Sequence, residues 1–455
     1  MYQKDYHIHF VGIGGIGMSG IAELLLSLGY TVSGSDIKLG HITQRLENQG
    51  ARIFKGHGGD QIGGADVVVT STAITQDNPE VIQAKERGTP IIQRAEMLAE
   101  LMRIKYAIAV SGAHGKTSTT SMIAEVLNTA GLDPTVIVGG LLKNLDTNAL
   151  HGKGDYIVAE ADESDGSFLK YSPAIAAVTN IDLEHLDYYT DIEDIKEKFL
   201  RFINSVPFYG VSVLCLDDEH IQDILPDIHV RHITFGMTAQ ADVQAKEIGF
   251  KGTTSSFRVI SKGTSLGRIT LNLSGRHNIS NALAAVATAL ELSIPFETIK
   301  KALEKIEGVK RRLEIKGEKN GILVMDDYGH HPTEITATLQ AVRESFPEKR
   351  MVVLFQPHRY TRTQKLFNDF ATSFYRSDRL VLLPVYAASE PEIEGVNSKN
   401  LAYAIQEHGH KNVSYANDFN EAISVLTGEL KTNDLVLTLG AGDIYTLGEK
   451  LLDTM

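Results

Sequence analysis

A glycine-rich loop from Ser111 to Thr117 carries the clearest chemical signal in the chain. It reads Ser-Gly-Ala-His-Gly-Lys-Thr and lies between an apolar run and a helical pattern. In loops of this kind, backbone amides surround phosphates, the lysine reaches the outer phosphates and the threonine hydroxyl ligates Mg²⁺. Val110 stands where the usual motif has its first glycine, so a coincidental turn is the alternative. The nucleotide-contacting residues that we expect are Gly112, Ala113, His114, Gly115, Lys116, Thr117 and Ser118.

Acidic residues follow two later apolar runs. Glu160 ends the run 156–160, and Asp162, Glu163 and Asp165 come directly after it. A nucleoside triphosphate site needs a carboxylate for its metal ion, ideally at the end of a neighbouring strand. His185 lies in the segment 179–187 after the next apolar run and could complete a second metal position. The predicted metal ligands are Thr117, Glu160 and His185. A solvated acidic loop and a surface histidine are the alternatives.

A second glycine loop lies near the start of the chain. Residues 12–17 fit the pattern G-x-G-x-x-G between a strand and a helix, and Asp36 ends the next strand, 19 residues after Gly17. Backbone amides of such a loop bind a diphosphate at a helix N-terminus, and the acid can bind a ribose hydroxyl. The loop predicts a nucleotide diphosphate more firmly than it predicts which nucleotide. A tight turn without a ligand is the alternative.

Short apolar runs alternate with helical patterns along the whole chain, which is typical of parallel α/β units. Two-residue alternation around 242–273 suggests antiparallel strands. We therefore predict three α/β domains, at residues 1–105, 106–309 and 310–455. The first and third are expected to be Rossmann-like and the second a phosphate-loop domain with extra antiparallel strands. The expected strands are 7–12, 31–35, 66–71, 90–93, 106–111, 156–160, 174–179, 321–325, 351–355, 379–384 and 434–439.

Composition sets outer limits on function. The 455 residues are too many for one core, and a formal net charge of -13 disfavours nucleic acid and anionic membranes as general partners. The single cysteine excludes a disulfide framework or a cysteine-cluster metal site within the chain. No apolar run reaches the length needed to cross a bilayer, so we expect a cytoplasmic protein without membrane insertion.

The chain contains two nucleotide-binding loop patterns, neither of them quite standard. With these two loops, its sequence resembles the Mur ligase family. The resemblance covers essentially the whole chain, and its specificity lies in the joint order of the motifs. They are 12–23, 71–74, 112–117, 160–168, 179–187, 275–278 with Asn281, 311–314, 326–333, 355–362 and 440–443. One departure is Ala113, where threonine would be expected. Other members use a carbamoylated lysine near the second metal, a role for which His185 is the candidate here.

The resemblance implies a division of labour among the three domains. The UDP-sugar would be bound in the first domain by Gly14, Gly15, Gly17, Asp36, Ser71 and Thr72. ATP and the metal ions, Mg²⁺ or Mn²⁺, would lie in the second, with Asn278 and Asn281 at the adenine. Arg312 would reach the γ-phosphate. The amino acid would be held by Tyr328, His330, His358, Arg359 and Arg362, with His331 as an alternative to His330. The implied catalytic groups are Lys116, Glu160, His185 and Arg312.

The implied reaction is ATP-dependent joining of L-alanine to the carboxylate of UDP-N-acetylmuramate through an acyl phosphate, in peptidoglycan synthesis. The expected partners are therefore small molecules, and the chain is expected to be a monomer or a homodimer. The nearest rival is the related ligase that attaches a tripeptide to the same sugar. An NAD-dependent oxidoreductase would leave the loop 112–117 unexplained. A nucleotide-hydrolysing switch would leave the first loop and the third domain unexplained.

Overall fold

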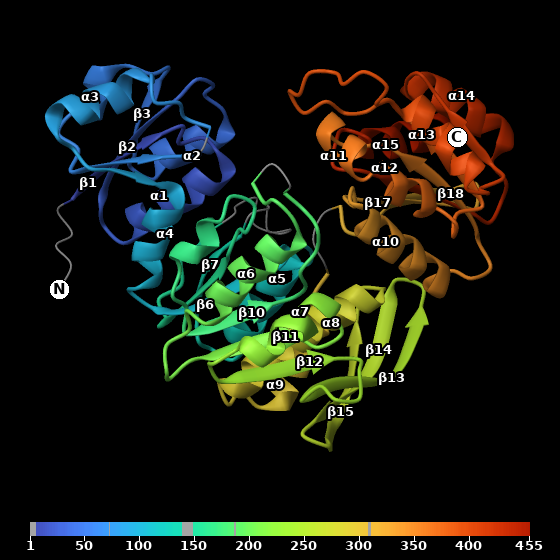
Figure 1. Ribbon diagram of the computed structural model, residues 1–455, viewed down its shortest axis with the longest axis horizontal. Coiled ribbons are helices and arrows are strands. Elements are labelled where there is room, and N and C mark those ends of the chain that lie inside the picture. Colours follow the sequence, from blue (N-terminus) through green and yellow to red (C-terminus); the bar gives the residue numbers. More distant parts are fainter. Residues whose placement is uncertain (1–5, 72, 139–148, 186–187, 308–310) are drawn as a thin grey trace. The chain divides into compact units, whose positions relative to one another are not determined.

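The computed structural model in Figure 1 describes residues 6–71, 73–138, 149–185, 188–307 and 311–455. The chain divides into two compact units. The first comprises Met1–Lys246, Arg258–Ile269 and Ser280–Lys305, and the second Glu247–Phe257, Thr270–Ile279 and Ile306–Met455. Three β-sheets carry the architecture.

The first sheet is a five-stranded parallel sheet with the strand order β3-β2-β1-β4-β5. The chain changes direction across the sheet between β1 and β4, and ligands of open α/β sheets bind at such a switch point. The strands are β1 His7–Val11, β2 Thr31–Asp36, β3 Arg52–Lys55, β4 Val67–Thr70 and β5 Ile91–Gln93. The helices are α1 Ile16–Ser27, α2 His41–Asn48, α3 Pro79–Arg87 and α4 Arg94–Met102, with the short 3₁₀ helix η1 Gly59–Ile62.

The central sheet has ten strands in the order β15-β14-β13-β12-β11-β10-β6-β9-β7-β8. Its strands are β6 Tyr106–Ser111, β7 Thr135–Ile137, β8 Ala149–Leu150, β9 Tyr156–Glu160, β10 Ile175–Val178, β11 Val211–Cys215, β12 His232–Gly236, β13 Val243–Lys251, β14 Thr254–Ser261 and β15 Thr264–Leu271. The associated helices are α5 Lys116–Thr129, η2 Ser167–Lys170, α6 Ile192–Ile203, α7 Glu219–Ile224, η3 Leu225–Asp227, α8 Arg276–Glu291 and α9 Phe296–Leu303. The parallel strands around β6 are almost fully buried, as sheets covered by helices on both faces require.

The third sheet has the order β16-β17-β21-β18-β19-β20, and only the pair β16–β17 is antiparallel among its described pairings. Alternate residues of its central strands enter two separate cores, Val353 and Phe355 on one face and Val352 and Leu354 on the other. The strands are β16 Glu314–Lys319, β17 Ile322–Asp327, β18 Arg350–Phe355, β19 Arg379–Leu382, β20 Val413–Tyr415 and β21 Asp434–Leu439. The helices are α10 Pro332–Ser345, α11 Tyr360–Lys365, α12 Phe367–Thr372, α13 Ser398–Glu407, α14 Phe419–Glu429 and α15 Tyr445–Thr454.

The predicted three-domain α/β architecture is confirmed. The expected strands 106–111, 156–160 and 434–439 agree with β6, β9 and β21 residue for residue. Strands β11 and β12 were not anticipated, and the alternating segment around 242–273 forms three strands. The boundaries near residues 105 and 309 remain predictions, because compactness alone yields two units that do not coincide with them.

Two further features concern the whole chain. Cys215 ends β11 with 4% of its surface exposed, and its Sγ lies 3.6 Å from the Ser280 Oγ. Burial raises the pKa of this thiol to about 11. Among the described residues, no helix is both long and apolar enough to cross a membrane.

Candidate active site

The loop between β6 and α5 has a backbone that only glycine adopts easily. Gly112 has φ +136° and Gly115 has φ +84°, in the region that side chains disfavour. A Cβ atom would also collide with Thr179 at Gly112 and with Asn281 at Gly115. Asn281 of α8 therefore lies directly beside the loop.

Residues that follow β10 hold the loop in place. The Asn180 Oδ1 accepts from the His114 N–H at 2.8 Å, and the Thr179 Oγ1 and Asn180 Nδ2 donate to the His114 carbonyl at 2.6 and 2.9 Å. The His114 Nε2 lies 2.8 Å from the Asp182 Oδ2. These contacts explain why the segment 179–182 matters, a role that sequence reasoning did not assign to Thr179 or Asn180.

Lys116 donates to the protein itself. Its ammonium donates to the carbonyls of Gly112 at 2.6 Å and Ala113 at 3.1 Å, and to the Glu163 Oε1 at 2.8 Å. Glu163 is a buried carboxylate, whose side chain is 3% exposed. Burial opposes the ammonium charge, but the nearby carboxylates, Glu163 first, outweigh it and raise the pKa of Lys116. The lysine is thus charged.

Glu163 also connects the loop to the predicted metal ligand His185. The His185 Nε2 lies 3.4 Å from the Glu163 Oε1 and 3.5 Å from the Glu184 Oε2. Burial opposes protonation of this histidine, but the two carboxylates outweigh it and raise the pKa of His185. One ligand atom from each of these three side chains lies within 4.8 Å of the others, a spacing that a metal ion could bridge.

The sequence-predicted metal ligands occupy neighbouring strand ends. Glu160 is the last residue of β9 and pairs with Val110 of β6, whereas Thr117 lies in the first turn of α5 and His185 follows β10. Carboxyl ends of parallel strands meet at one edge of a sheet. The donor types of these residues suit a divalent cation. The cluster of possible ligand atoms within 4.8 Å comprises Glu163, Glu184 and His185, of which sequence reasoning had selected only His185.

The first glycine loop is tied to the end of β2. The Ser35 carbonyl accepts from the N–H groups of Gly12 and Ile13 at 2.8 and 2.9 Å, and the Asp36 Oδ2 accepts from the Gly14 N–H at 2.9 Å. A Cβ atom on Gly14 would lie 2.8 Å from that carboxylate oxygen. Asp36 therefore shapes the loop in addition to any contact with a ribose.

Three other residues are expected around the UDP-sugar and are described by the structure. Gly15 and Gly17 lie in this loop, and Ser71 comes directly after β4, the strand that neighbours β1 on the side away from β2. Gly15 is the N-cap of α1 and supplies no side-chain cap, and a Cβ on Gly17 would lie 2.8 Å from the Arg94 Nη1. Ser71 follows β4, and its carbonyl accepts from the Ile74 N–H at 3.0 Å. Thr72 lies outside the described residues.

Aromatic rings form a row in the third sheet's domain. The ring centroids of Tyr328 and His330 are 5.3 Å apart, those of His330 and His358 are 5.7 Å apart, and those of His358 and Tyr386 are 5.5 Å apart and stacked. Burial first, and then the neighbouring His330, Arg362 and Arg359, lower the pKa of His358 to about 4. His358 is therefore neutral at pH 7.

The two adjacent histidines have different surroundings. His331 is 3% exposed and caps α10, where its Nδ1 accepts from the Thr333 N–H at 3.4 Å. His330 lies in the aromatic row instead. Of the cationic residues expected nearby, the Arg362 Nη1 lies 3.3 Å from the His358 Nδ1, and Arg359 lies 4.0 Å from Glu390.

The arginine pair before β16 is anchored through its first member. The Arg311 Nε donates to the Asp326 Oδ2 at 3.1 Å and its Nη2 donates to the Gly440 carbonyl at 2.5 Å. Its guanidinium also lies over the rings of Tyr328 and Tyr445, at 4.9 and 4.7 Å. Sequence reasoning selected only the second arginine.

Arg312, the sequence-predicted γ-phosphate ligand, is less tightly held. Its Nη1 lies 3.4 Å from the Glu334 Oε1, and its guanidinium lies 5.5 Å from the centroid of the Tyr328 ring. Burial opposes its charge, but Glu334 and Asp327 outweigh that effect and raise the pKa of Arg312. Asn278, the other predicted adenine contact, is buried and its Nδ2 donates to the Ser274 carbonyl at 2.7 Å.

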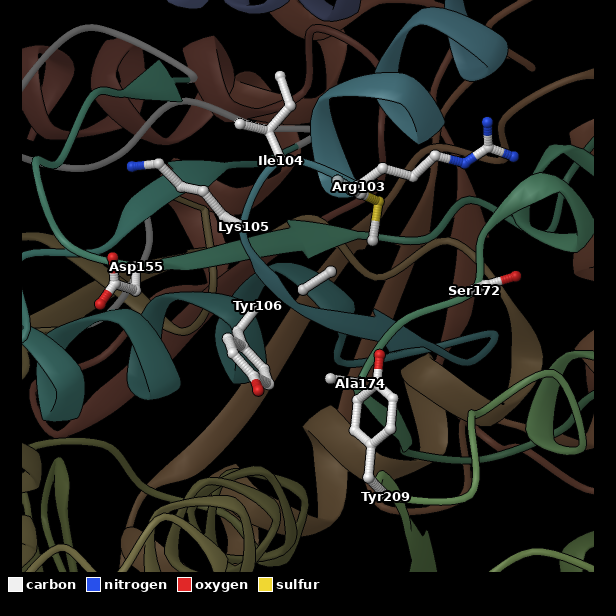
Figure 2. Close-up of a pocket in the computed structure, with 10 residues that line it drawn as sticks. Arg103, Ile104, Lys105, Tyr106, Asp155, Ser172, Ala174 and Tyr209 are labelled. Carbon is white, nitrogen blue, oxygen red and sulfur yellow. The ribbon is translucent and has the colours of Figure 1, made fainter. Parts of the chain in front are cut away.

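Figure 2 shows a cavity of about 530 Å³. It lies at the ends of the strands opposite to the loop of residues 111–117. Residues at or just before the first residue of a strand line it: Tyr106 of β6, Asp155 before β9, Ala174 before β10 and Tyr209 before β11. Strands of five or six residues separate the two ends by about 17–20 Å. This cavity is therefore separate from the loop of residues 111–117.

Family models match the three parts of the chain in order. The Mur ligase family catalytic domain model matches residues 7–106, the Mur ligase middle domain residues 110–289, and the Mur ligase glutamate ligase domain residues 311–442.

Curated proteins match over the full length. The UDP-N-acetylmuramate–L-alanine ligase of Desulforapulum autotrophicum is 69% identical over 100% of both chains. The enzyme of the same name from Desulfatibacillum aliphaticivorans is 59% identical over 99% of both. Among solved structures, UDP-N-acetylmuramate–alanine ligase from Thermotoga maritima has a TM-score of 0.80 at 30% identity over 98% of both chains. A murein peptide ligase from Psychrobacter arcticus has a TM-score of 0.67 at 25% identity over 98% of both.

Proposed function

We infer that this chain, which belongs to the Mur ligase family, joins L-alanine to the carboxylate of UDP-N-acetylmuramate and uses ATP to do so. The observation that carries this conclusion is the 69% identity, over both full lengths, to a ligase of that name. The reaction belongs to peptidoglycan synthesis. The two glycine loops and the aromatic row supply one binding region for each of the three substrates.

The reaction requires activation of a carboxylate. The sugar's carboxylate oxygen bonds to the γ-phosphorus of ATP, the bond to ADP breaks, and an acyl phosphate forms. The amine of L-alanine then attacks the acyl carbon, loses a proton and expels phosphate. The protein must orient three ligands, neutralise several anionic oxygens and exclude water from the acyl phosphate.

The phosphate loop is our proposed ATP site. Lys116 would leave Glu163 to contact the outer phosphates, while the amides of the loop would donate to the others. Asn281, beside Gly115, and Asn278 offer both donors and acceptors, as an adenine edge requires. Thr117, Glu160 and His185 are the residues that we propose to hold Mg²⁺ or Mn²⁺, which when bound would withdraw charge from the phosphate oxygens. Arg312 is proposed for the γ-phosphate.

The other two substrates are assigned to the other two sheets. The loop from Gly12 to Gly17 would bind the diphosphate of the UDP-sugar through its backbone amides and the N-terminus of α1. Asp36 and the segment from Ser71 would complete that site. In the third domain, Arg359 and Arg362 suit the carboxylate of L-alanine, and the rings of Tyr328, His330 and His358 would enclose its methyl group.

The test is phosphate release with single omissions and mass detection of the product. Phosphate should form only when ATP, a divalent cation, UDP-N-acetylmuramate and L-alanine are all present. Glycine and L-serine should react weakly, since one methyl group in a pocket discriminates by about 1–3 kcal/mol. Equal ATP hydrolysis without sugar or amino acid would favour a nucleotide switch. Reaction with a tripeptide and not with L-alanine would assign the chain to the peptide-recycling branch.

A further inference from the structure

We propose that His330 is the general base that takes a proton from the ammonium group of the incoming amino acid before the nitrogen attacks the acyl phosphate. This assignment rests on the proposed function and deepens it. It gives a proton transfer to a residue that is otherwise expected only to enclose the methyl group of the substrate. All the residues that carry it belong to the domain of the third sheet.

The second step of the reaction requires a proton acceptor. An α-amino group is mostly an ammonium at neutral pH, and an ammonium has no lone pair with which to attack. In the assigned route the first proton moves to the Nε2 atom of His330 and then to water. The nitrogen bonds to the acyl carbon, the bond from that carbon to the phosphate oxygen breaks, and the second proton goes to the departing phosphate.

His330 lies at the edge of the third sheet where ligands of α/β folds bind. It follows β17 and His358 follows β18, so both come after the carboxyl ends of parallel strands that flank β21. Their ring centroids are 5.7 Å apart. Arg362, which contacts His358, is expected to bind the carboxylate, and the nitrogen of an α-amino acid lies about 2.5 Å from the carboxylate carbon. A substrate held in this way has its nitrogen beside the paired rings.

The partners of the His330 Nδ1 atom determine where the ring carries its hydrogen. Nδ1 lies 3.1 Å from the Tyr328 carbonyl oxygen and 3.4 Å from the Glu334 Oε2. A carbonyl and a carboxylate only accept, so Nδ1 carries the hydrogen of the neutral ring and Nε2 carries the lone pair. The same Glu334 oxygen accepts from the His330 backbone N–H at 3.0 Å. A carboxylate held at Nδ1 stabilises the imidazolium that forms when Nε2 accepts a proton.

The neighbouring histidines lack this arrangement. The His358 Nδ1 faces the Arg362 Nη1 at 3.3 Å, and a guanidinium only donates, so the lone pair of this ring is directed at the arginine. Burial first, and then His330 and the nearby arginines, lower the pKa of His358 to about 4, which makes it a weak base. His331 is 3% exposed and its Nδ1 caps α10. Of these three rings, only that of His330 has a carboxylate behind one nitrogen and a lone pair on the other.

The experiment compares full-length His330→Gln with the wild type in two assays. Phosphate release at pH 7 with ATP, Mg²⁺, UDP-N-acetylmuramate and L-alanine should fall at least about a hundredfold, the lower end of what a general base contributes. With hydroxylamine in place of L-alanine, the acyl hydroxamate should form at the wild-type rate, because hydroxylamine is mostly uncharged at neutral pH and needs no base. Hydroxamate formation also shows that the variant folds, binds both nucleotides and makes the acyl phosphate.

Glycine separates a base from a residue that only packs against the methyl group. A packing role predicts a higher KM for L-alanine and an unchanged reaction of glycine. A base acts on the ammonium of both amino acids, so His330→Gln should lower kcat by the same factor for both. His408→Gln is the matched control and should leave all these rates unchanged. The His408 Nδ1 also lies close to a backbone carbonyl, that of Ala404 at 2.8 Å, but His408 is exposed at the end of α13.

The pH dependence provides a further readout. The deficit of His330→Gln relative to the wild type should shrink at least about tenfold between pH 7 and pH 9, because the fraction of free amine rises with pH and makes a base unnecessary. The ratio of the two proteins is the appropriate quantity, since both retain the other titratable and charged groups around the two rings. These groups are Glu334 with its partner Arg312, Tyr328, His358, Arg359 and Arg362.

Three results would overturn the assignment: a deficit confined to L-alanine, a deficit of the same size at pH 7 and pH 9, or an equal loss of hydroxamate formation. Failure of the proposed function would look different. If the wild-type chain joined a tripeptide and not L-alanine, that function would fall, and the same ratios measured with the amine of the tripeptide would still decide the role of His330.

Discussion

Replacing Arg311 with alanine should destabilise the domain of the third sheet far more than it should disturb ATP binding. The Asp326 carboxylate that Arg311 contacts is 0% exposed, and burial already raises its pKa. Removal of one partner of a buried ion pair costs about 3–5 kcal/mol, because the other charge remains buried. Protonation of Asp326 would relieve part of this cost. The two aromatic contacts of Arg311 add about 0.5–1 kcal/mol each. We therefore expect a loss of about 3–5 kcal/mol.

Arg343→Ala is the matched control for this change. Arg343 pairs with Asp378 at 2.8 Å and also donates to backbone carbonyls, but the side chains are 31% and 44% exposed. Exposed pairs contribute about 0–1 kcal/mol. The difference between the two variants thus isolates the burial of the carboxylate.

Hydrogen exchange followed by mass spectrometry is the appropriate assay. The chain has no tryptophan to report unfolding, and several domains make one global transition unsuitable. Amides of β17 and β21 flank the anchor and should lose protection in Arg311→Ala by a factor of about 100 or more, which corresponds to about 3 kcal/mol. Equal protection in Arg311→Ala and Arg343→Ala would refute the reasoning and leave Arg311 as a surface cation.

Three further outcomes are expected. Gly14→Ala should weaken UDP-sugar binding in calorimetry without changing ATP binding, whereas Gly64→Ala, where a Cβ meets nothing within 4 Å, should leave both unchanged. Because the pKa of His358 is lowered from 6.5 to about 4, the unfolded chain binds more protons between these values. The free energy of unfolding should therefore fall as the pH drops from 6.5 to about 4, by on the order of 1 kcal/mol after solvent screening. In denaturant titrations at several pH values, His358→Gln should show a weaker dependence of this free energy on pH. Arg312→Ala should lower kcat at least a hundredfold. It should cost only about 1 kcal/mol of stability, because the Arg312 side chain in its ion pair with Glu334 is 34% exposed. A large loss of stability with a loss of activity in proportion to it would mean that Arg312 is a structural residue.

The fold and the phosphate loop were predictable from the sequence because their signals are local. A strand, a glycine turn and a helix follow one another within about 20 residues, and each glycine occupies a position whose backbone needs it. The buried strands read as apolar runs. Short or unexpectedly placed strands such as β11 had no comparable signal.

The remaining features depend on which way a side chain faces. Residue types alone do not show that Arg311 is held by Asp326 whereas Arg312 reaches Glu334. Nor do they distinguish His330 from His331, one of which lies in a ring stack and the other in a helix cap. In the sequence, Glu163 is one of several acids that follow the run 156–160. Its hydrogen bond with Lys116, which only the structure shows, distinguishes it from the others.

The burial of Cys215 has a practical consequence. As the single cysteine of the chain, held 4% exposed with its pKa raised to about 11, it is almost entirely a thiol at neutral pH and reacts poorly with maleimides. The unmodified chain is therefore a ready background for spectroscopic labelling. A cysteine introduced on an exposed position of each glycine-loop domain would accept a fluorophore or a spin label selectively, and changes in the distance between labels on adding ATP, sugar and amino acid in turn would report domain movement.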